Sequence, residues 1–141
     1  RATIEIMRNM GLVELKEGHH ETARQHLVDA LQRAESARLP ELVGKGHLAL
    51  GELHAATLFD ASGPEEASSD AAACFRQAIA VFSALGVEAE CARALRRLGE
   101  YHVERGELDE GRQTLLRAAE IFERLNMPGS KGLRNFLREL R

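Results

Sequence analysis

The residues best suited to catalysis or metal binding in this chain are its six histidines and two cysteines. His20, Glu21 and His26 have the composition of a zinc-binding helix. Such a helix needs two histidines four residues apart, so that both point to one side. His20 and His26 are six residues apart, which places them about 240° apart around a helix. Because His19 and His20 also lie at an expected turn, we interpret the group as a solvated turn and predict no metal site there.

A second set of histidines recurs at helical spacing. His47 and His54 are seven residues apart and share a helix face, and His102 occupies the position of His54 in the next repeat described below. Stacked histidines can bind a metal or sense pH. Two histidines without a third ligand or a carboxylate make a poor metal site. We interpret them as packing residues where helices cross, each with one hydrogen bond, and keep metal binding or pH sensing as the alternative.

Cysteine content and charge argue against a disulfide-stabilised protein and a nucleic-acid-binding protein. Cys74 and Cys91 do not make a disulfide framework. They occupy apolar helical positions, where a free cysteine behaves as a small hydrophobic residue, so we expect a reducing cytoplasm. The net charge of -3 gives no reason to expect a nucleic acid partner. No apolar run approaches the length of a membrane span, and no signal peptide is visible.

Three closely spaced glycines raise the question of a phosphate-binding loop. Gly99, Gly106 and Gly111 are separated by seven and five residues. A dinucleotide fingerprint has different spacings and connects a strand to a helix. No nucleophile beside a base is recognisable either. We therefore predict no catalytic residue, no cofactor and no enzymatic activity.

The elements that must position these residues are helices. Apolar residues recur at intervals of three and four, and no sustained alternation of apolar and polar residues indicates a strand. The pattern predicts an all-α protein of about seven helices. The expected ranges are 3–17, 20–38, 41–60, 65–85, 87–105, 108–126 and 130–140.

Small residues reveal an internal repeat. Three glycines inside helices are separated by 40 and 48 residues, and three alanines by 48 and 40 residues. The glycines are Gly11, Gly51 and Gly99, and the alanines are Ala30, Ala78 and Ala118. One unit of about forty residues therefore occurs three times, with eight extra residues inside the second unit.

Each repeated glycine has a structural explanation. Two antiparallel helices approach closely only where a side chain at the crossing is very small. Gly11, Gly51 and Gly99 are the expected crossing points, and they face Ala23, Ala71 and Gly111 on the partner helices. Gly18 and Gly106 suit turns, because glycine adopts a positive φ at low cost.

The eight extra residues fall between the two helices of the middle unit. Pro40 and Pro64 suit first helical positions. Eight residues would lengthen each helix by about one turn, with Leu58 and Phe59 packing on the extension. The alternative is a looser loop around Ser62 and Gly63.

These repeats resemble the tetratricopeptide repeat (TPR) family. They are similar to its long-helix variants, in which each repeat is longer than the usual unit of the family. The resemblance covers nearly the whole chain and is clearest in the third unit. Signature positions there are filled by Leu95, Leu98, Gly99, Gly106, Leu108, Asp109, Glu110, Gly111, Leu115 and Ala118. His102 fills an aromatic site, and the closing proline of each unit is missing.

The resemblance implies a right-handed superhelix, or α-solenoid, of antiparallel helix pairs. We expect one domain over 1–141, with units at about 3–40, 41–86 and 87–126 and a capping helix at about 130–141. We also expect the chain to be a fragment of a longer protein. The family binds proteins or peptides on a concave face lined by the first helix of each pair.

By helical phase, that concave face has a basic lip and a small apolar middle. We predict that it binds an acidic segment or a C-terminal carboxylate of a protein or peptide. The predicted binding residues are Arg8, Asn9, Leu12, Lys45, Leu48, Ala49, Glu52, Arg93, Arg96, Arg97 and Glu100.

The basic positions also resemble the carboxylate clamp of chaperone-binding TPR proteins. Arg8, Arg93 and Arg97 match its basic sites, but Leu12 and Ala49 stand at its two amide sites, so the clamp is incomplete. The alternative is that these arginines form an ordinary solvated helix face.

Two other functions fit the same repeats. The chain resembles regulatory or sensor segments of larger bacterial transcription regulators and signalling ATPases, which contain long TPR arrays. It is also compatible with self-association through the last helix, whose apolar residues are Leu133, Phe136, Leu137 and Leu140.

Overall fold

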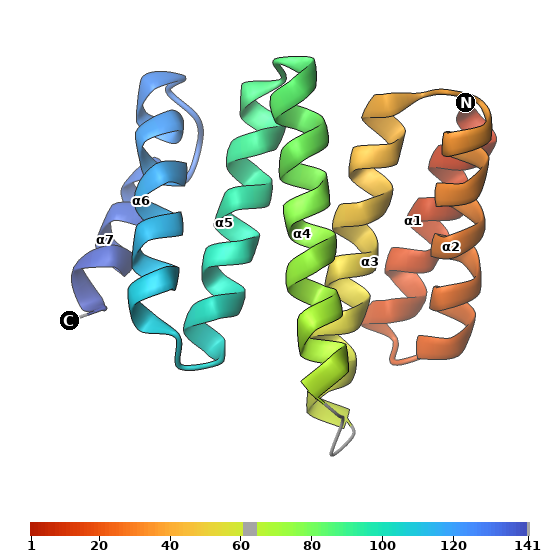
Figure 1. Ribbon diagram of the computed structural model, residues 1–141, viewed down its shortest axis with the longest axis horizontal. Helices are drawn as coiled ribbons and strands as arrows, with labels where there is room; N and C mark the ends of the chain where they lie inside the picture. Colours follow the sequence, from red (N-terminus) through yellow and green to blue (C-terminus); the bar gives the residue numbers. More distant parts are fainter. Residues whose placement is uncertain (61–64, 141) are drawn as a thin grey trace. The chain divides into compact units, whose positions relative to one another are not determined.

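Seven helices account for nearly all of the chain that the computed structural model describes (Figure 1). The description covers the backbone of residues 1–60 and 65–140, and the side chains of residues 1–57 and 71–140. The helices are α1 (Ala2–Lys16), α2 (His20–Ser36), α3 (Pro40–Asp60), α4 (Glu65–Leu85), α5 (Glu88–Glu104), α6 (Leu108–Arg124) and α7 (Ser130–Glu139). The described residues contain no strand, which confirms the all-α prediction.

The chain divides into two compact units, Arg1–Val81 and Phe82–Arg141. The boundary falls inside α4, whereas the predicted repeat boundary lay at residues 86 and 87. We call these the N-terminal unit and the C-terminal unit and describe each by itself. Across the described residues, no helix is both long enough and apolar enough to cross a membrane.

Helix α2 lies between α1 and α3 in the core of the N-terminal unit. One cluster joins α2 to α3 and contains Ala23, Leu27, Leu31, Ala49, Leu50 and Leu53. The predicted crossing glycines lie at close contacts. A Cβ added to Gly11 would lie 2.7 Å from the Leu27 side chain, and one on Gly51 would lie 2.6 Å from the Phe75 ring.

The C-terminal unit repeats the same arrangement in α5 and α6. A Cβ on Gly99 would lie 2.6 Å from Leu115, and one on Gly111 would lie 3.1 Å from the carbonyl oxygen of Gly99. The two glycines therefore face each other, as the repeat predicts. Helix α7 packs against α6, where Leu133 is buried and Arg134 lies 2.6 Å from Glu123.

Five helix ends share one turn geometry. A residue with positive φ follows each helix, and the next residue donates its backbone N–H to the carbonyl five positions earlier, as in a Schellman motif. The positive-φ residues are Gly18, Arg38, Gly86, Gly106 and Asn126. The closing bonds are 2.8 to 3.0 Å long and run from His19 to Glu14, Leu39 to Ala34, Val87 to Phe82, Glu107 to His102 and Met127 to Phe122.

The middle helices are longer than their counterparts. Helices α3 and α4 contain 21 residues each, whereas α5 and α6 contain 17 each. The eight extra residues therefore lengthen both helices by about one turn, as predicted. The expected packing of Leu58 and Phe59 and the alternative loop at Ser62 and Gly63 fall outside the described side chains.

Candidate functional site

Most of the predicted concave residues of the N-terminal unit lie on accessible parts of α1 and α3. Asn9 is exposed, and the other accessible members are half-buried: Arg8, Leu12, Lys45, Leu48 and Glu52. Ala49 is different, because it is only 3% exposed and belongs to the core cluster with α2. Its prediction as a binding residue is therefore wrong: the helix turns that methyl group toward α2.

The guanidinium of Arg8 has a hydrogen-bond donor without an acceptor in the described part of the chain. Its Nη1 atom is buried and has no hydrogen-bond partner in the described part of the chain. A buried polar group without a partner is costly, and more so when it is charged. Lys45, by contrast, lies 3.7 Å from Glu41.

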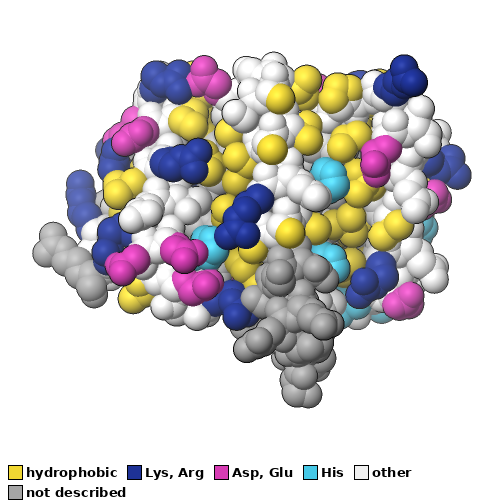
Figure 2. Space-filling view, in the orientation of Figure 1, with side chains coloured by type: hydrophobic (Ala, Val, Ile, Leu, Met, Phe, Trp, Pro, Cys, Tyr) yellow, Lys and Arg dark blue, Asp and Glu magenta, His cyan; other side chains and the backbone are white. Residues whose placement is uncertain are grey.

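The predicted arginines of the C-terminal unit already have carboxylate partners. Arg93 donates to Glu90 across 2.8 Å, and Arg97 donates to Glu100 across 3.0 Å. Arg96 lies 3.8 Å from the same Glu100. The structure thus brings Arg96, Arg97 and Glu100 together, and Glu100 offsets the basic charge expected there. Figure 2 shows the same mixture on the face it displays, where basic and acidic side chains lie next to one another.

The repeat explains why Arg8 differs from Arg96. The two residues are equivalent, because both lie three positions before a crossing glycine. Arg96 has Glu100 four positions further along the helix, and Arg8 has Leu12 at that place. The carboxylate that accompanies Arg96 is therefore missing beside Arg8.

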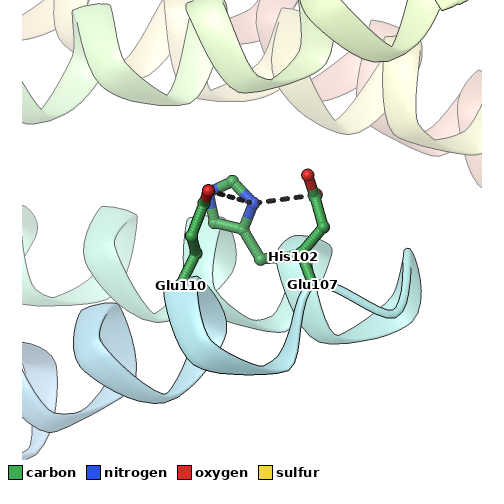
Figure 3. A group of neighbouring side chains, drawn as sticks. All are labelled: His102, Glu107 and Glu110. Carbon is green, nitrogen blue, oxygen red and sulfur yellow. Dashed lines mark hydrogen bonds and ion pairs between the residues drawn. The ribbon is translucent and has the colours of Figure 1, made fainter.

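His102 is the centre of a cluster that the sequence did not predict (Figure 3). The ring is 4% exposed, and its Nδ1 lies 3.1 Å from Glu107 and 3.7 Å from Glu110. His102 lies in the last turn of α5, Glu107 is the N-cap residue of α6, and Glu110 lies in the first turn of α6. One ligand atom from each of the three residues lies within 4.8 Å of the others.

This cluster can act in two chemical ways. A protonated His102 forms an ion pair with two carboxylates, and a neutral imidazole with two carboxylates offers three ligands to a divalent cation. Sequence reasoning favoured a packing role for His102 and kept metal binding as the alternative, because no carboxylate was evident beside it. The available signal was the turn itself, which reverses the chain between His102 and Glu107 and so brings the two residues together.

The remaining histidines have separate surroundings. His26 was grouped with the solvated turn, but its Nδ1 lies 2.5 Å from the carboxylate of Glu14 on α1. His47 is half-buried on α3, and its burial lowers the pKa below 6.5, while the nearby Glu35 opposes that shift.

Cys74 and Cys91 are not joined in a disulfide, and both are half-buried. Cys74 packs against the core cluster of the N-terminal unit. Burial raises the pKa of the Cys91 thiol above 9.0, although the nearby Arg117 opposes the shift. A raised pKa lowers the fraction of reactive thiolate, so the predicted role of Cys91 as a packing residue agrees with its surroundings.

An apolar stripe on α1 was not among the predicted binding residues. Its members are Ile6, Met10 and Val13, which are 57%, 46% and 54% exposed. Together with Asn9 and Glu14 they line a shallow open groove. We call Ile6, Met10 and Val13 the α1 stripe.

A scan against models of protein families finds no match, and a search of curated proteins finds none either.

Proposed function

We propose that the chain is a protein-binding module of the TPR type, a right-handed cytoplasmic superhelix without catalytic activity. Binding uses the accessible face of α1 and α3 in the N-terminal unit. The observation that supports this proposal is Arg8, whose buried Nη1 has no hydrogen-bond partner in the described part of the chain. Arg8 as a whole is only half-buried, so a ligand oxygen would satisfy that donor once the guanidinium turns toward solvent.

The ligand is a peptide carrying a carboxylate, either in an acidic segment or at its C-terminus. Glu100 supplies a carboxylate to Arg96 from within the C-terminal unit, so the equivalent Arg8 is suited to a carboxylate from outside. Arginine presents a planar fork of donors that matches a carboxylate. Leu12 lies four residues after Arg8 on α1, and Leu48 is the repeat equivalent of Arg8 on α3; both are half-buried and offer apolar surface to the peptide.

Fluorescence anisotropy with a library of short acidic peptides tests this function. Each peptide is made with a free and with an amidated C-terminus, which separates terminal from side-chain recognition. We expect Arg8→Gln to weaken binding about tenfold, the loss expected for a charge-assisted hydrogen bond of about 1.4 kcal/mol.

Arg33→Gln is the matched control, because Arg33 lies on α2 and pairs with Asp29 across 3.3 Å. Its peptide affinity should equal that of the unmodified protein. Failure of every acidic peptide to bind, or equal affinity of the Arg8→Gln protein, would contradict the proposal.

A further inference from the structure

The cluster of His102, Glu107 and Glu110 lies in the C-terminal unit, at the turn between α5 and α6, and takes no part in the proposed peptide site. Figure 3 shows the imidazole between the two carboxylates. Arg105 lies 3.7 Å from Glu107, so with a neutral imidazole two carboxylates face one positive charge. The remaining negative charge favours an added cation.

Helix capping does not account for the two carboxylates. An N-cap side chain commonly accepts a hydrogen bond from the first turn of its helix, but the side chain of Glu107 makes no such bond. A glutamate three positions later, as Glu110 is, commonly reaches back to the N-cap N–H. That N–H is already donated to the carbonyl oxygen of His102 across 2.9 Å. Both carboxylates are therefore left to face the imidazole.

The fold holds the nitrogen donor firmly and leaves the oxygen donors accessible. The backbone bond from Glu107 to His102 closes the turn, and the ring of His102 is 4% exposed, so it has little freedom to turn away. The side chains of Glu107 and Glu110 are 43% and 63% exposed, which gives an ion a path from solvent. A donor fixed on rigid elements is what a binding site requires.

The distances within the cluster suit a small transition-metal ion. Zinc binds nitrogen and oxygen at about 2.0 to 2.2 Å in a tetrahedron, which places neighbouring ligand atoms about 3.3 Å apart. The distances from Nδ1 of His102 to the two carboxylates are 3.1 and 3.7 Å, on either side of that value. An imidazole suits zinc and similar ions, whereas calcium and magnesium prefer oxygen ligands alone.

The first helix pair shows that the turn itself does not require this cluster. A shift of 88 residues moves its three positions onto Glu14, His19 and Thr22. The same backbone closure is present there, from His19 to Glu14 across 2.9 Å. The Glu14 carboxylate pairs instead with His26, and threonine stands in place of the third ligand. Among the described residues, only the α5–α6 turn brings three such ligand side chains together.

We propose that His102, Glu107 and Glu110 bind zinc or another divalent transition-metal ion, and that the ion clamps the end of α5 to the start of α6. The three side chains leave one tetrahedral position for water or for a donor from outside the chain. Because the ligands come from both helices, the ion binds the folded turn and stabilises it by mass action.

Isothermal titration calorimetry of the chelator-treated full chain tests the proposal. Zinc chloride is the probe, and magnesium and calcium chloride are the comparison. We expect saturable binding of zinc and no comparable binding of magnesium or calcium. Zinc should also raise the temperature of unfolding, and in NMR spectra it should shift the signal of Nδ1 of His102.

Variants of the same turn provide the controls. Glu110→Gln alters an exposed side chain and should weaken zinc binding at least about tenfold, since even residues behind the ligands contribute that much. Asp109→Asn removes the same charge from a neighbour that is 95% exposed and should leave the affinity unchanged. His102→Gln should abolish binding, with circular dichroism as the control for folding.

Three results would overturn the proposal. The first is the absence of saturable zinc binding. The second is zinc affinity that Glu110→Gln leaves intact or that His26→Gln reduces instead, because the ion would then bind elsewhere. The third is magnesium or calcium binding as tight as that of zinc, which would identify a site that depends on the carboxylates alone.

Discussion

Acidic residues three or four positions away along the helix pair with the arginines of α5. Arg96 is 3.8 Å from Glu100, whereas the equivalent Arg8 has Leu12 four positions later, and its Nη1 has no hydrogen-bond partner among the described residues. A count of basic residues therefore overstates the cationic surface, because most of the predicted arginines are already paired. Whether such an arginine is available to a ligand therefore depends on single neighbouring residues in its helix.

Exchanging the residues at positions 12 and 100 should exchange the pairing of the two arginines: Arg8 would gain a carboxylate neighbour, and Arg96 would lose one. Leu12→Glu supplies Arg8 with an internal carboxylate, so we expect acidic peptides to bind the N-terminal unit more weakly. Anisotropy titrations would measure the loss. Circular dichroism is the control for folding, because Leu12 also packs against the core cluster.

The reciprocal change, Glu100→Leu, removes the carboxylate that lies 3.8 Å from Arg96. We expect it to create weak affinity for acidic peptides in the C-terminal unit, detectable as NMR shifts of α5 amides. Unchanged binding in both variants would show that the neighbour four residues later does not control these arginines.

His47 should make the stability of the chain depend on pH. Its pKa is lowered by burial in the folded protein, so the unfolded chain binds more protons below pH 6.5. The free energy of unfolding therefore falls as the pH drops through 6.5. The stability that neutral His47 contributes is fully present only above that value. We expect His47→Gln to reduce the pH dependence between about pH 8 and pH 5, measured by urea denaturation.

His19→Gln is a suitable comparison, because His19 is exposed at the first turn. It should leave the pH dependence nearly unchanged. Equal slopes for His47→Gln and the unmodified protein would contradict the assignment.

The sequence predicted the environment of the histidines only in part. His102 was expected at a helix crossing with one hydrogen bond, and it is buried with a bond to Glu107. The contact of His26 with Glu14 was not predicted. Such contacts join side chains across a turn, and their distances depend on rotamers that periodicity does not encode.

Among the elements, α5 and α6 approach each other closely at two glycines. A Cβ on Gly99 would meet Leu115 at 2.6 Å, and one on Gly111 would meet the carbonyl oxygen of Gly99 at 3.1 Å. The carbonyl is part of the backbone and has little freedom to move aside. Two facing glycines therefore set how near these helices lie.

Gly111→Ala should consequently destabilise the protein. Overpacking at a tight contact typically costs 1–3 kcal/mol, and that cost exceeds the gain of about 1 kcal/mol from replacing a helical glycine. Chemical denaturation would measure the difference. Gly132→Ala is the control, because it lies in α7 with nothing within 4 Å of an added Cβ. It should be neutral or stabilising, and a neutral Gly111→Ala would contradict the tight crossing.

The order and extent of the helices were largely predictable. The expected ranges agree with the observed ones within about two residues, because the apolar period, the turn glycines and Pro40 mark the ends. The lengthening of α3 and α4 was also predicted. Arg38 and Asn126 take the left-handed turn conformation without being glycine, so these two turns lacked the usual sequence signal.

At the scale of the whole molecule, the offsets of 40 and 48 residues predicted the helix pairs but not the division into two compact units. That division falls inside α4 and depends on packing across the full chain. The burial of Ala49 was missed for a related reason: helical phase locates a face, whereas the neighbouring helix decides what covers it.

Removal of residues 130–141 should weaken the C-terminal unit. Helix α7 buries Leu133 and brings Arg134 to Glu123 of α6, so its loss exposes apolar surface. We expect faster amide hydrogen exchange in α6 and increased self-association in sedimentation experiments. Leu133→Ser in the full chain should reproduce the effect in milder form. A full chain that associates while the truncated chain is monomeric would instead identify α7 as an interface.

The shared turn geometry also affects how such a chain can evolve. The turns that join one pair of helices to the next carry the apolar residues Leu39, Val87 and Met127, whereas the turns within pairs carry the polar residues His19 and Glu107. Recombination at a turn between two helix pairs joins helix ends that have matching backbone geometry, and it leaves each pair of helices intact. A hairpin added or removed at such a turn would need no new kind of connection, whereas a break within the α5–α6 pair would separate Gly99 from Gly111.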